Sequence, residues 1–137
     1  MRIVADTNLI ISSIFWSGAP YKIIRYALQK KLEIITSQEI LNEVRKVLTD
    51  PQDRFELSEQ ELDDVINGIV LYANIINPTI NIDIVRDPKD NHGVACAIAA
   101  KAEYIVTRDK DLLVLKTHAG IKIITPDDFL TLFKSED

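Results

Sequence analysis

Short apolar runs alternate with longer segments of helical spacing along most of this chain. Runs of this length that are rich in β-branched residues are typical of strands buried in a sheet. The predicted strands span residues 2–5, 33–36, 104–107 and 121–125. A further segment, 80–84, alternates isoleucines with polar residues. It is either a half-buried strand or extended loop, because Asn81 and Asp83 are poor strand formers.

Apolar positions between these strands recur every three or four residues, which indicates amphipathic helices. Ser37 and Ser58 are typical N-cap residues, and Glu61 stands at the capping-box spacing from Ser58. The predicted helices span residues 9–16, 20–28, 38–48, 59–73, 92–102, 111–115 and 126–133. The alternation of strands and helices predicts a three-layer α/β domain with a mostly parallel sheet. The helix 92–102 is apolar almost all round, so we expect it to be buried.

The composition is typical of one globular domain spanning residues 1–137. The chain is 47% hydrophobic and 27% charged, so it can build a substantial core. No apolar run approaches the roughly 20 residues of a membrane span, and Asp6 ends the first run too early for a signal peptide. A single cysteine, Cys96, allows no intrachain disulfide. We therefore expect a cytoplasmic protein without membrane association, with Cys96 as a small buried residue.

Five acidic residues stand out from the rest of the charged positions. Asp6 directly follows a predicted strand, Asp109 and Asp111 come just after another, and Asp90 precedes a predicted helix. Each aspartate alone has an ordinary explanation as a helix N-cap. Glu43 is harder to explain, because it lies on the border of the apolar stripe of its helix, and a carboxylate leaning toward a core needs a partner.

These acids would need a cation if the fold brings them together. Two carboxylates about 4 Å apart repel by roughly 4 kcal/mol at an effective dielectric constant of 20. Four of them in one pocket would cost more than a small domain can easily absorb. All the candidate ligands are oxygen atoms, which favours Mg²⁺ or Mn²⁺ over zinc or copper. His92 adjoins the group but is the only histidine there, so we interpret it as a surface residue.

The net charge and the missing motifs narrow the function further. A formal net charge of −5 weighs against a strong nucleic-acid binder, although five of the negative charges belong to the candidate site. The four glycines form neither a phosphate loop nor a dinucleotide fingerprint. The chain also has no Gly-x-Ser-x-Gly elbow, no cysteine–histidine zinc set and no evident nucleophile–base pair.

Four acidic motifs together resemble those of a known family, the PIN domain. The motifs lie in the expected order and span about residues 1 to 130: VADTN at 4–8, SQEILNE at 37–43, RDPKD at 86–90 and VTRDKDLL at 106–113. The last two strings are most similar to the branch of toxin components in bacterial or archaeal toxin–antitoxin pairs. Asp87 lies outside the usual acidic quartet and is interpreted as a turn residue.

The resemblance implies a Rossmann-like α/β/α sandwich with Mg²⁺- or Mn²⁺-dependent ribonuclease activity. It also implies a small antitoxin partner and, frequently, a homodimer. The acidic set of the family, as catalytic and metal-binding residues, falls on Asp6, Glu43, Asp90 and Asp109. Asp111 would be an auxiliary acid, and Asn8 and Thr107 would be polar neighbours that orient ligands or the attacking water.

The resulting hypothesis is hydrolysis of single-stranded RNA with one or two Mg²⁺ or Mn²⁺ ions. The alternative is a catalytically silent module on the same fold that binds a metal or a partner. A phosphatase on a similar sheet is a third possibility, but Asn8 occupies the second place of its Asp-x-Asp pair.

Other residues near the motifs are candidates for contacts with RNA. Three cations could contact phosphate, although surface roles are more common for such residues: Lys101, Arg108 and Lys110. The aromatic residues Phe15, Trp16 and Tyr21 follow the first acid. We expect them to pack in the core or in a dimer interface rather than to stack on bases.

Overall fold

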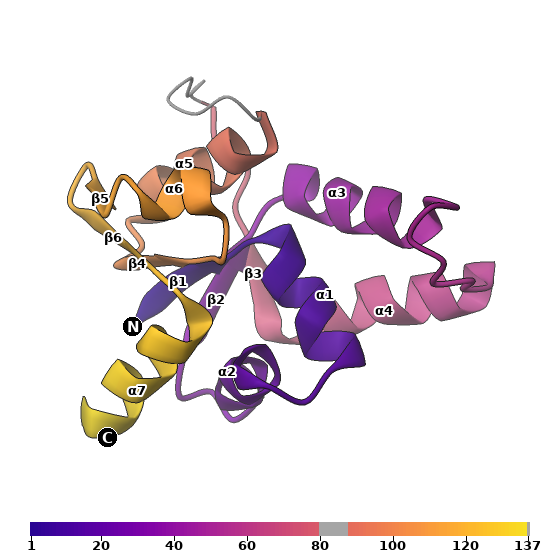
Figure 1. Ribbon diagram of the computed structural model, residues 1–137, viewed down its shortest axis with the longest axis horizontal. Helices are drawn as coiled ribbons and strands as arrows, with labels where there is room; N and C mark the ends of the chain where they lie inside the picture. The colour runs from indigo at the N-terminus through magenta and orange to yellow at the C-terminus, as the bar shows by residue number, and fades with distance from the viewer. Residues whose placement is uncertain (80–87, 137) are drawn as a thin grey trace.

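The computed structural model describes the backbone at residues 1–79 and 88–136 and the side chains at residues 1–79 and 91–134 (Figure 1). The strands are β1 (Arg2–Ala5), β2 (Glu33–Thr36), β3 (Ala73–Ile75), β4 (Tyr104–Val106), β5 (Thr117–His118) and β6 (Ile121–Ile124). The helices are α1 (Thr7–Phe15), α2 (Ala19–Leu28), α3 (Gln38–Thr49), α4 (Glu59–Tyr72), α5 (Pro88–Ala100), α6 (Lys110–Leu113) and α7 (Pro126–Glu136).

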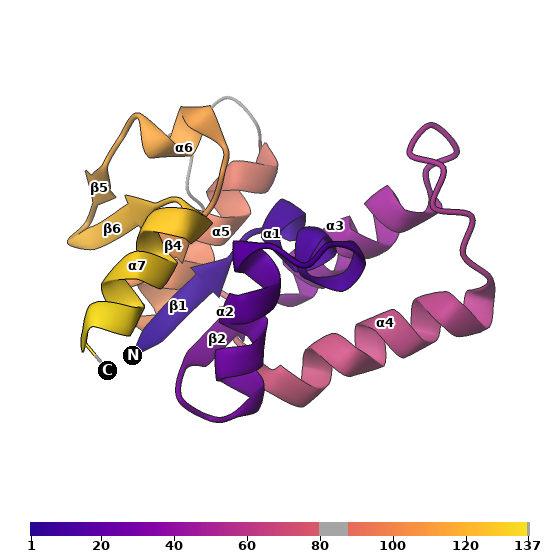
Figure 2. The same ribbon diagram turned by 60° about the horizontal axis from the view of Figure 1, so that its bottom comes forward.

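The strands form one sheet in the order β3-β2-β1-β4-β6-β5. All neighbouring pairs are parallel except β5 with β6. Figure 2 shows α2 and α7 in front of this sheet and α5 behind it. The predicted three-layer α/β/α sandwich with a mostly parallel, Rossmann-like sheet is therefore confirmed. Because β1 and β4 are parallel neighbours, their carboxyl ends meet at one edge of the sheet.

The core lies between the sheet and its helices. The strand residues Ile3, Val4, Ile34 and Ile105 are fully buried, as expected of a sheet that is covered on both faces. The predicted burial of the fifth helix is also confirmed, because the helix contacts β1, β2 and β4 and contributes these residues to the core: Val94, Cys96, Ala97 and Ala100. Burial raises the pKa of the Cys96 thiol to about 12, which agrees with a structural rather than a reactive cysteine.

Local capping explains why several helices begin where the sequence predicts. Ser37 accepts a hydrogen bond from the backbone of Ile40, and Ser58 forms the complete capping box with Glu61. Pro20 stands in the first turn of α2, where its missing N–H is not needed. The fifth helix begins at Pro88, because proline is also tolerated in its first turn. The predicted start at residue 92 was therefore one turn too late.

Two short strands were not predicted. The helix predicted for 59–73 ends at Tyr72, and Ala73 begins β3, which pairs with β2. Strand β5 pairs with β6 through a tight turn in which Ala119 and Gly120 both have positive φ angles, of 52° and 80°. Such turns close two-residue hairpins. Both strands are too short to show a periodic pattern, and only the neighbouring strand makes them extended.

Two predictions concern residues outside the part of the chain that the structure describes: the strand or loop at 80–84 and the turn at Asp87. Within the described ranges, no helix has the length and apolar character needed to span a membrane.

Candidate active site

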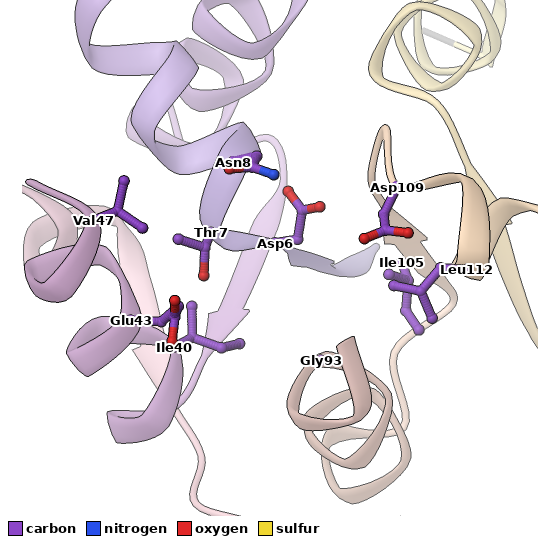
Figure 3. Close-up of a pocket in the computed structure, with 10 residues that line it drawn as sticks. All are labelled: Asp6, Thr7, Asn8, Ile40, Glu43, Val47, Gly93, Ile105, Asp109 and Leu112. Carbon is purple, nitrogen blue, oxygen red and sulfur yellow. The ribbon is translucent and has the colours of Figure 1, made fainter. Parts of the chain in front are cut away.

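The carboxyl end of the sheet carries a pocket of about 110 Å³ that three of the four predicted core acids line. Figure 3 shows Asp6 between Glu43 on α3 and Asp109 at the start of α6. The complete lining consists of Asp6, Thr7, Asn8, Ile40, Glu43, Val47, Gly93, Ile105, Asp109 and Leu112. A volume of this size accepts a few water molecules or a partly hydrated cation.

Asp6 is held firmly at the floor of this pocket. It is the N-cap of α1, and its Oδ1 accepts a hydrogen bond of 2.8 Å from the backbone N–H of Leu9. Its Oδ2 accepts a hydrogen bond from the hydroxyl of Thr107. Burial raises the pKa of Asp6 above its usual value, and the nearby Asp109 raises it further, against the lowering effects of the two hydrogen bonds and of Arg108. Without a cation, this carboxylate is therefore destabilised in its charged form.

Thr107 joins the two strand ends that carry these acids. It is fully buried directly after β4, donates its hydroxyl proton to Asp6 and accepts a hydrogen bond of 3.0 Å from the backbone N–H of Asp109. One hydroxyl thus satisfies a carboxylate and a backbone donor, as buried polar groups require. It fixes the position of Asp6 relative to the loop that follows β4.

Asp109 and Asp111 have different positions although they are two residues apart. Asp109 is the N-cap of the short helix α6, and its Oδ1 accepts a hydrogen bond of 2.8 Å from the backbone N–H of Asp111. Asp109 lines the pocket, whereas Asp111 is half-buried beside it and is not part of the lining. The structure therefore places Asp109 in the pocket lining, and the auxiliary role of Asp111 stays a prediction.

Glu43 lies on the wall of the pocket that α3 supplies (Figure 3). The predicted position of Glu43 on the border of the apolar stripe is correct, because its side chain is half-buried. Ile40 and Val47, one helical turn before and after it on α3, also line the pocket. Asn8 is exposed in the first turn of α1 and belongs to the same lining.

Asp90 lies in the first turn of α5, three residues before Gly93, which lines the pocket. The side chain of Asp90 is outside the described residues, so its place in the acidic set stays a prediction. Among the side chains that the structure describes, no three acidic, histidine or cysteine residues converge closely enough to bind a metal ion as a complete group.

The apolar lining was not predicted from the sequence. Ile105 and Leu112 belong to the lining together with Ile40, Val47 and Gly93. Ile40 and Val47 stand three residues before and four residues after Glu43, and this spacing on α3 was the available signal. Apolar walls reduce the local dielectric constant and thereby strengthen the interaction of the acids with a cation.

The aromatic residues that follow the first acidic motif differ in part from expectation. Trp16 is 60% exposed, and Phe15 and Tyr21 are also exposed, so the predicted packing in the core is wrong for all three. Packing in a dimer interface stays a prediction. The ring of Phe15 instead contacts those of Trp16 and Phe55 at the surface. His92 is half-buried, and its Nε2 lies 3.6 Å from the Glu39 carboxylate of α3.

The donor set of the pocket fits a hard divalent cation. Its charged groups are carboxylates, its polar neighbours offer amide and hydroxyl oxygens, and the buried Asp6 carries a charge that a cation would stabilise. Asp6, Glu43 and Asp109 are the acidic residues of the described lining, and water molecules would have to complete the coordination of an ion there.

Comparison with solved structures supports the same fold. The VapBC2 complex of Rickettsia felis bound to a promoter DNA fragment matches with a TM-score of 0.63 and 16% identity, over 90% of this chain and 97% of that one. PAE2754 from Pyrobaculum aerophilum matches with a TM-score of 0.62 and 12% identity, over 98% and 90% of the two chains. The RRP44 PIN domain of T. brucei matches with a TM-score of 0.52 and 12% identity, over 98% and 82%.

Comparison of the amino-acid sequence with family models assigns the chain to a family. No curated protein matches the chain. The family model described as PIN domain matches residues 2–111, a segment that includes all four acidic motifs except the last two residues of the fourth. The order of the motifs, the sandwich and this match agree, and the chain belongs to the PIN domain family, whose members are generally nucleases that use divalent metal ions.

Proposed function

We propose that this chain is a Mg²⁺- or Mn²⁺-dependent endoribonuclease that hydrolyses phosphodiester bonds of single-stranded RNA. The observation that carries the proposal is the pocket in which Asp6, Glu43 and Asp109 line a common space at the carboxyl end of the sheet. Carboxylates in such a pocket suit one or two hard cations that keep positions open for water and phosphate oxygens. Membership of a nuclease family supports the same reading.

The residues of the chain would divide the work as follows. Asp6 and Asp109, which Thr107 fixes relative to each other, would hold the cation from the sheet side, and Glu43 would hold it from α3. Asp90 is the proposed fourth acid. Asn8 lies at the exposed side of the pocket, where it can orient the attacking water or the RNA. When bound, the divalent cation supplies a water of lowered pKa and offsets the charge that develops on the phosphate.

The toxin–antitoxin relationship is the biological part of the proposal. The two last motifs and the similarity in fold to the VapBC2 complex support a toxin with a small antitoxin protein as its partner. The homodimer implied by the resemblance stays a prediction, as do the cytoplasmic location, the auxiliary role of Asp111 and the number of ions.

The proposal is tested with a labelled single-stranded RNA incubated with the purified protein in Mg²⁺, in Mn²⁺ and in EDTA. We expect cleavage in either metal and none in EDTA. The Glu43→Gln variant should cleave about 10- to 100-fold more slowly and need more Mg²⁺, because it loses one of the negative charges of the pocket. Glu59→Gln is the matched control, since Glu59 is exposed in the first turn of α4.

The outcomes separate the two hypotheses that the sequence left open. Cleavage that requires metal and depends on Glu43 supports the nuclease. No cleavage in either metal, from folded protein free of any antitoxin, would favour the catalytically silent binding module instead.

Thr107→Val tests whether the buried hydroxyl organises the site. Valine has nearly the same shape but leaves Asp6 Oδ2 and the backbone N–H of Asp109 without their shared partner. We expect about 1–3 kcal/mol lower stability in urea unfolding and about 10- to 100-fold slower cleavage. Thr131→Val on the exposed side of α7 should change stability by less than about 0.5 kcal/mol. Equal effects of the two substitutions would contradict this role of Thr107.

A further inference from the structure

The structure distinguishes among the three cations that stand near the acidic motifs. Lys101 follows α5 and precedes β4, so it lies at the amino end of the strands, at the edge of the sheet opposite the pocket. Lys110 is exposed at the start of α6. Arg108 lies between Thr107 and Asp109, at the edge where the acids meet.

Arg108 borders a second, small hollow beside the acidic pocket. This hollow of about 20 Å³ is lined by Asn8, Leu9, Ser12, Pro20, Arg108 and Pro126. Asn8 also lines the acidic pocket, so the two spaces adjoin through this residue. Arg108 therefore stands next to the Asn8 side of the acidic pocket.

The guanidinium of Arg108 is available to a ligand, because its ion pair within the chain is weak. Its ion partner is Asp127 of α7, with Nη2 and Oδ2 3.9 Å apart and both side chains more than half exposed. An exposed pair at that separation contributes little stability, so a phosphate can replace Asp127 at small cost.

We infer that Arg108 is a substrate-binding residue that contacts an RNA phosphate next to the one held over the acidic pocket. This inference rests on the proposed ribonuclease function. The planar guanidinium suits a phosphate because it can donate two parallel hydrogen bonds to its oxygens. Asn8 and Ser12, in the same hollow, offer polar groups to the adjoining sugar or phosphate.

The test uses binding and cleavage of the same labelled single-stranded RNA. Binding is measured in Mg²⁺ with proteins that carry Asp6→Asn, so that the RNA is not cut during the measurement. The Asp6→Asn protein is compared with three double variants, in which Asp6→Asn is combined with Arg108→Gln, Arg108→Lys or Lys101→Gln. We expect Arg108→Gln to weaken binding about tenfold, Arg108→Lys to weaken it less, and Lys101→Gln to leave it within about twofold. The slope of log binding constant against log salt concentration should fall by about 0.7 for Arg108→Gln, as for one lost phosphate contact on a single strand.

Cleavage by proteins that retain Asp6 adds a second readout. Arg108→Gln should raise KM by about the same factor while kcat changes much less, since the contact lies outside the reacting group. Its Mg²⁺ requirement should stay equal or fall, because removal of a positive charge cannot weaken binding of a cation. A higher Mg²⁺ requirement would indicate damage to the acidic pocket and would overturn the inference.

The binding arm keeps this inference separate from the proposed function. If Arg108→Gln and Lys101→Gln weaken binding equally, or neither does, the inference is wrong even when the wild-type protein cleaves RNA. If no protein cleaves RNA but Arg108→Gln alone weakens binding and reduces the salt slope, the inference stands and the nuclease function falls.

Discussion

Replacement of Asp6 by asparagine should abolish metal-dependent cleavage of RNA, with a loss of at least about 10²- to 10³-fold, while the fold stays intact. Asparagine can still accept the hydrogen bond from the backbone of Leu9, and its amide N–H can donate to the hydroxyl of Thr107. It cannot supply the negative charge that a cation needs. Cleavage assays beside circular dichroism would show loss of function without loss of structure.

A matched control for this substitution is Asp53→Asn, since Asp53 is exposed in the loop between α3 and α4. It should cleave RNA at the rate of the unchanged protein. Cleavage by the Asp6→Asn variant at a comparable rate would remove the proposed mechanism, and unfolding of that variant in EDTA would assign Asp6 a mainly structural role.

The unchanged protein and the Asp6→Asn variant should differ in how their stability depends on pH in EDTA. Burial raises the pKa of Asp6 in the folded protein above the ordinary value of 3.8. The contribution of Asp6 to stability is therefore present in full below about pH 3.8 and is lost as the pH rises through the raised pKa. Asparagine does not titrate, so the stability of the variant relative to the unchanged protein should rise across this window and then level off. Added Mg²⁺ should stabilise the unchanged protein more than the variant.

Phe129→Ala should cost about 3–5 kcal/mol of unfolding free energy, which is the largest effect on stability that we expect. Phe129 of α7 is fully buried, and its ring lies 5.5 Å from that of Tyr104 on β4 and 5.7 Å from that of Phe133. Alanine would leave a cavity between α7 and the sheet. Unfolding in urea, followed by circular dichroism, measures the loss as a lower transition midpoint.

Lys134→Ala is the control on the same helix, because Lys134 is exposed, and it should shift stability by less than about 0.5 kcal/mol. The family match ends at residue 111, before α7 begins. A large loss for Phe129→Ala would support the proposal that residues 1–137 fold as one domain. Coincident transitions for the two variants would show instead that α7 contributes little to the fold.

The sequence by itself determined the elements that carry strong local signals. Strands β1 and β2 have the predicted bounds because each has a buried apolar centre and is followed directly by a capping residue. Asp6, Ser37 and Ser58 begin their helices through hydrogen bonds to residues three positions ahead, and such signals are visible in the chain alone. The four acidic motifs were visible for the same reason, as short strings of fixed spacing.

Only the tertiary structure decided which elements contact one another. Strands β3 and β5 form because β2 and β6 pair with them through backbone hydrogen bonds. The local sequence of a short segment does not indicate that such a neighbouring strand is present. The hydroxyl of Thr107 reaches Asp6 across 101 positions of sequence because β4 pairs with β1. Trp16 is exposed although it is a large aromatic residue, because its place in the fold lies outside the core. Local hydrogen bonds and periodicity fix the elements, whereas the order of the strands decides that Asp6, Glu43 and Asp109 line one pocket.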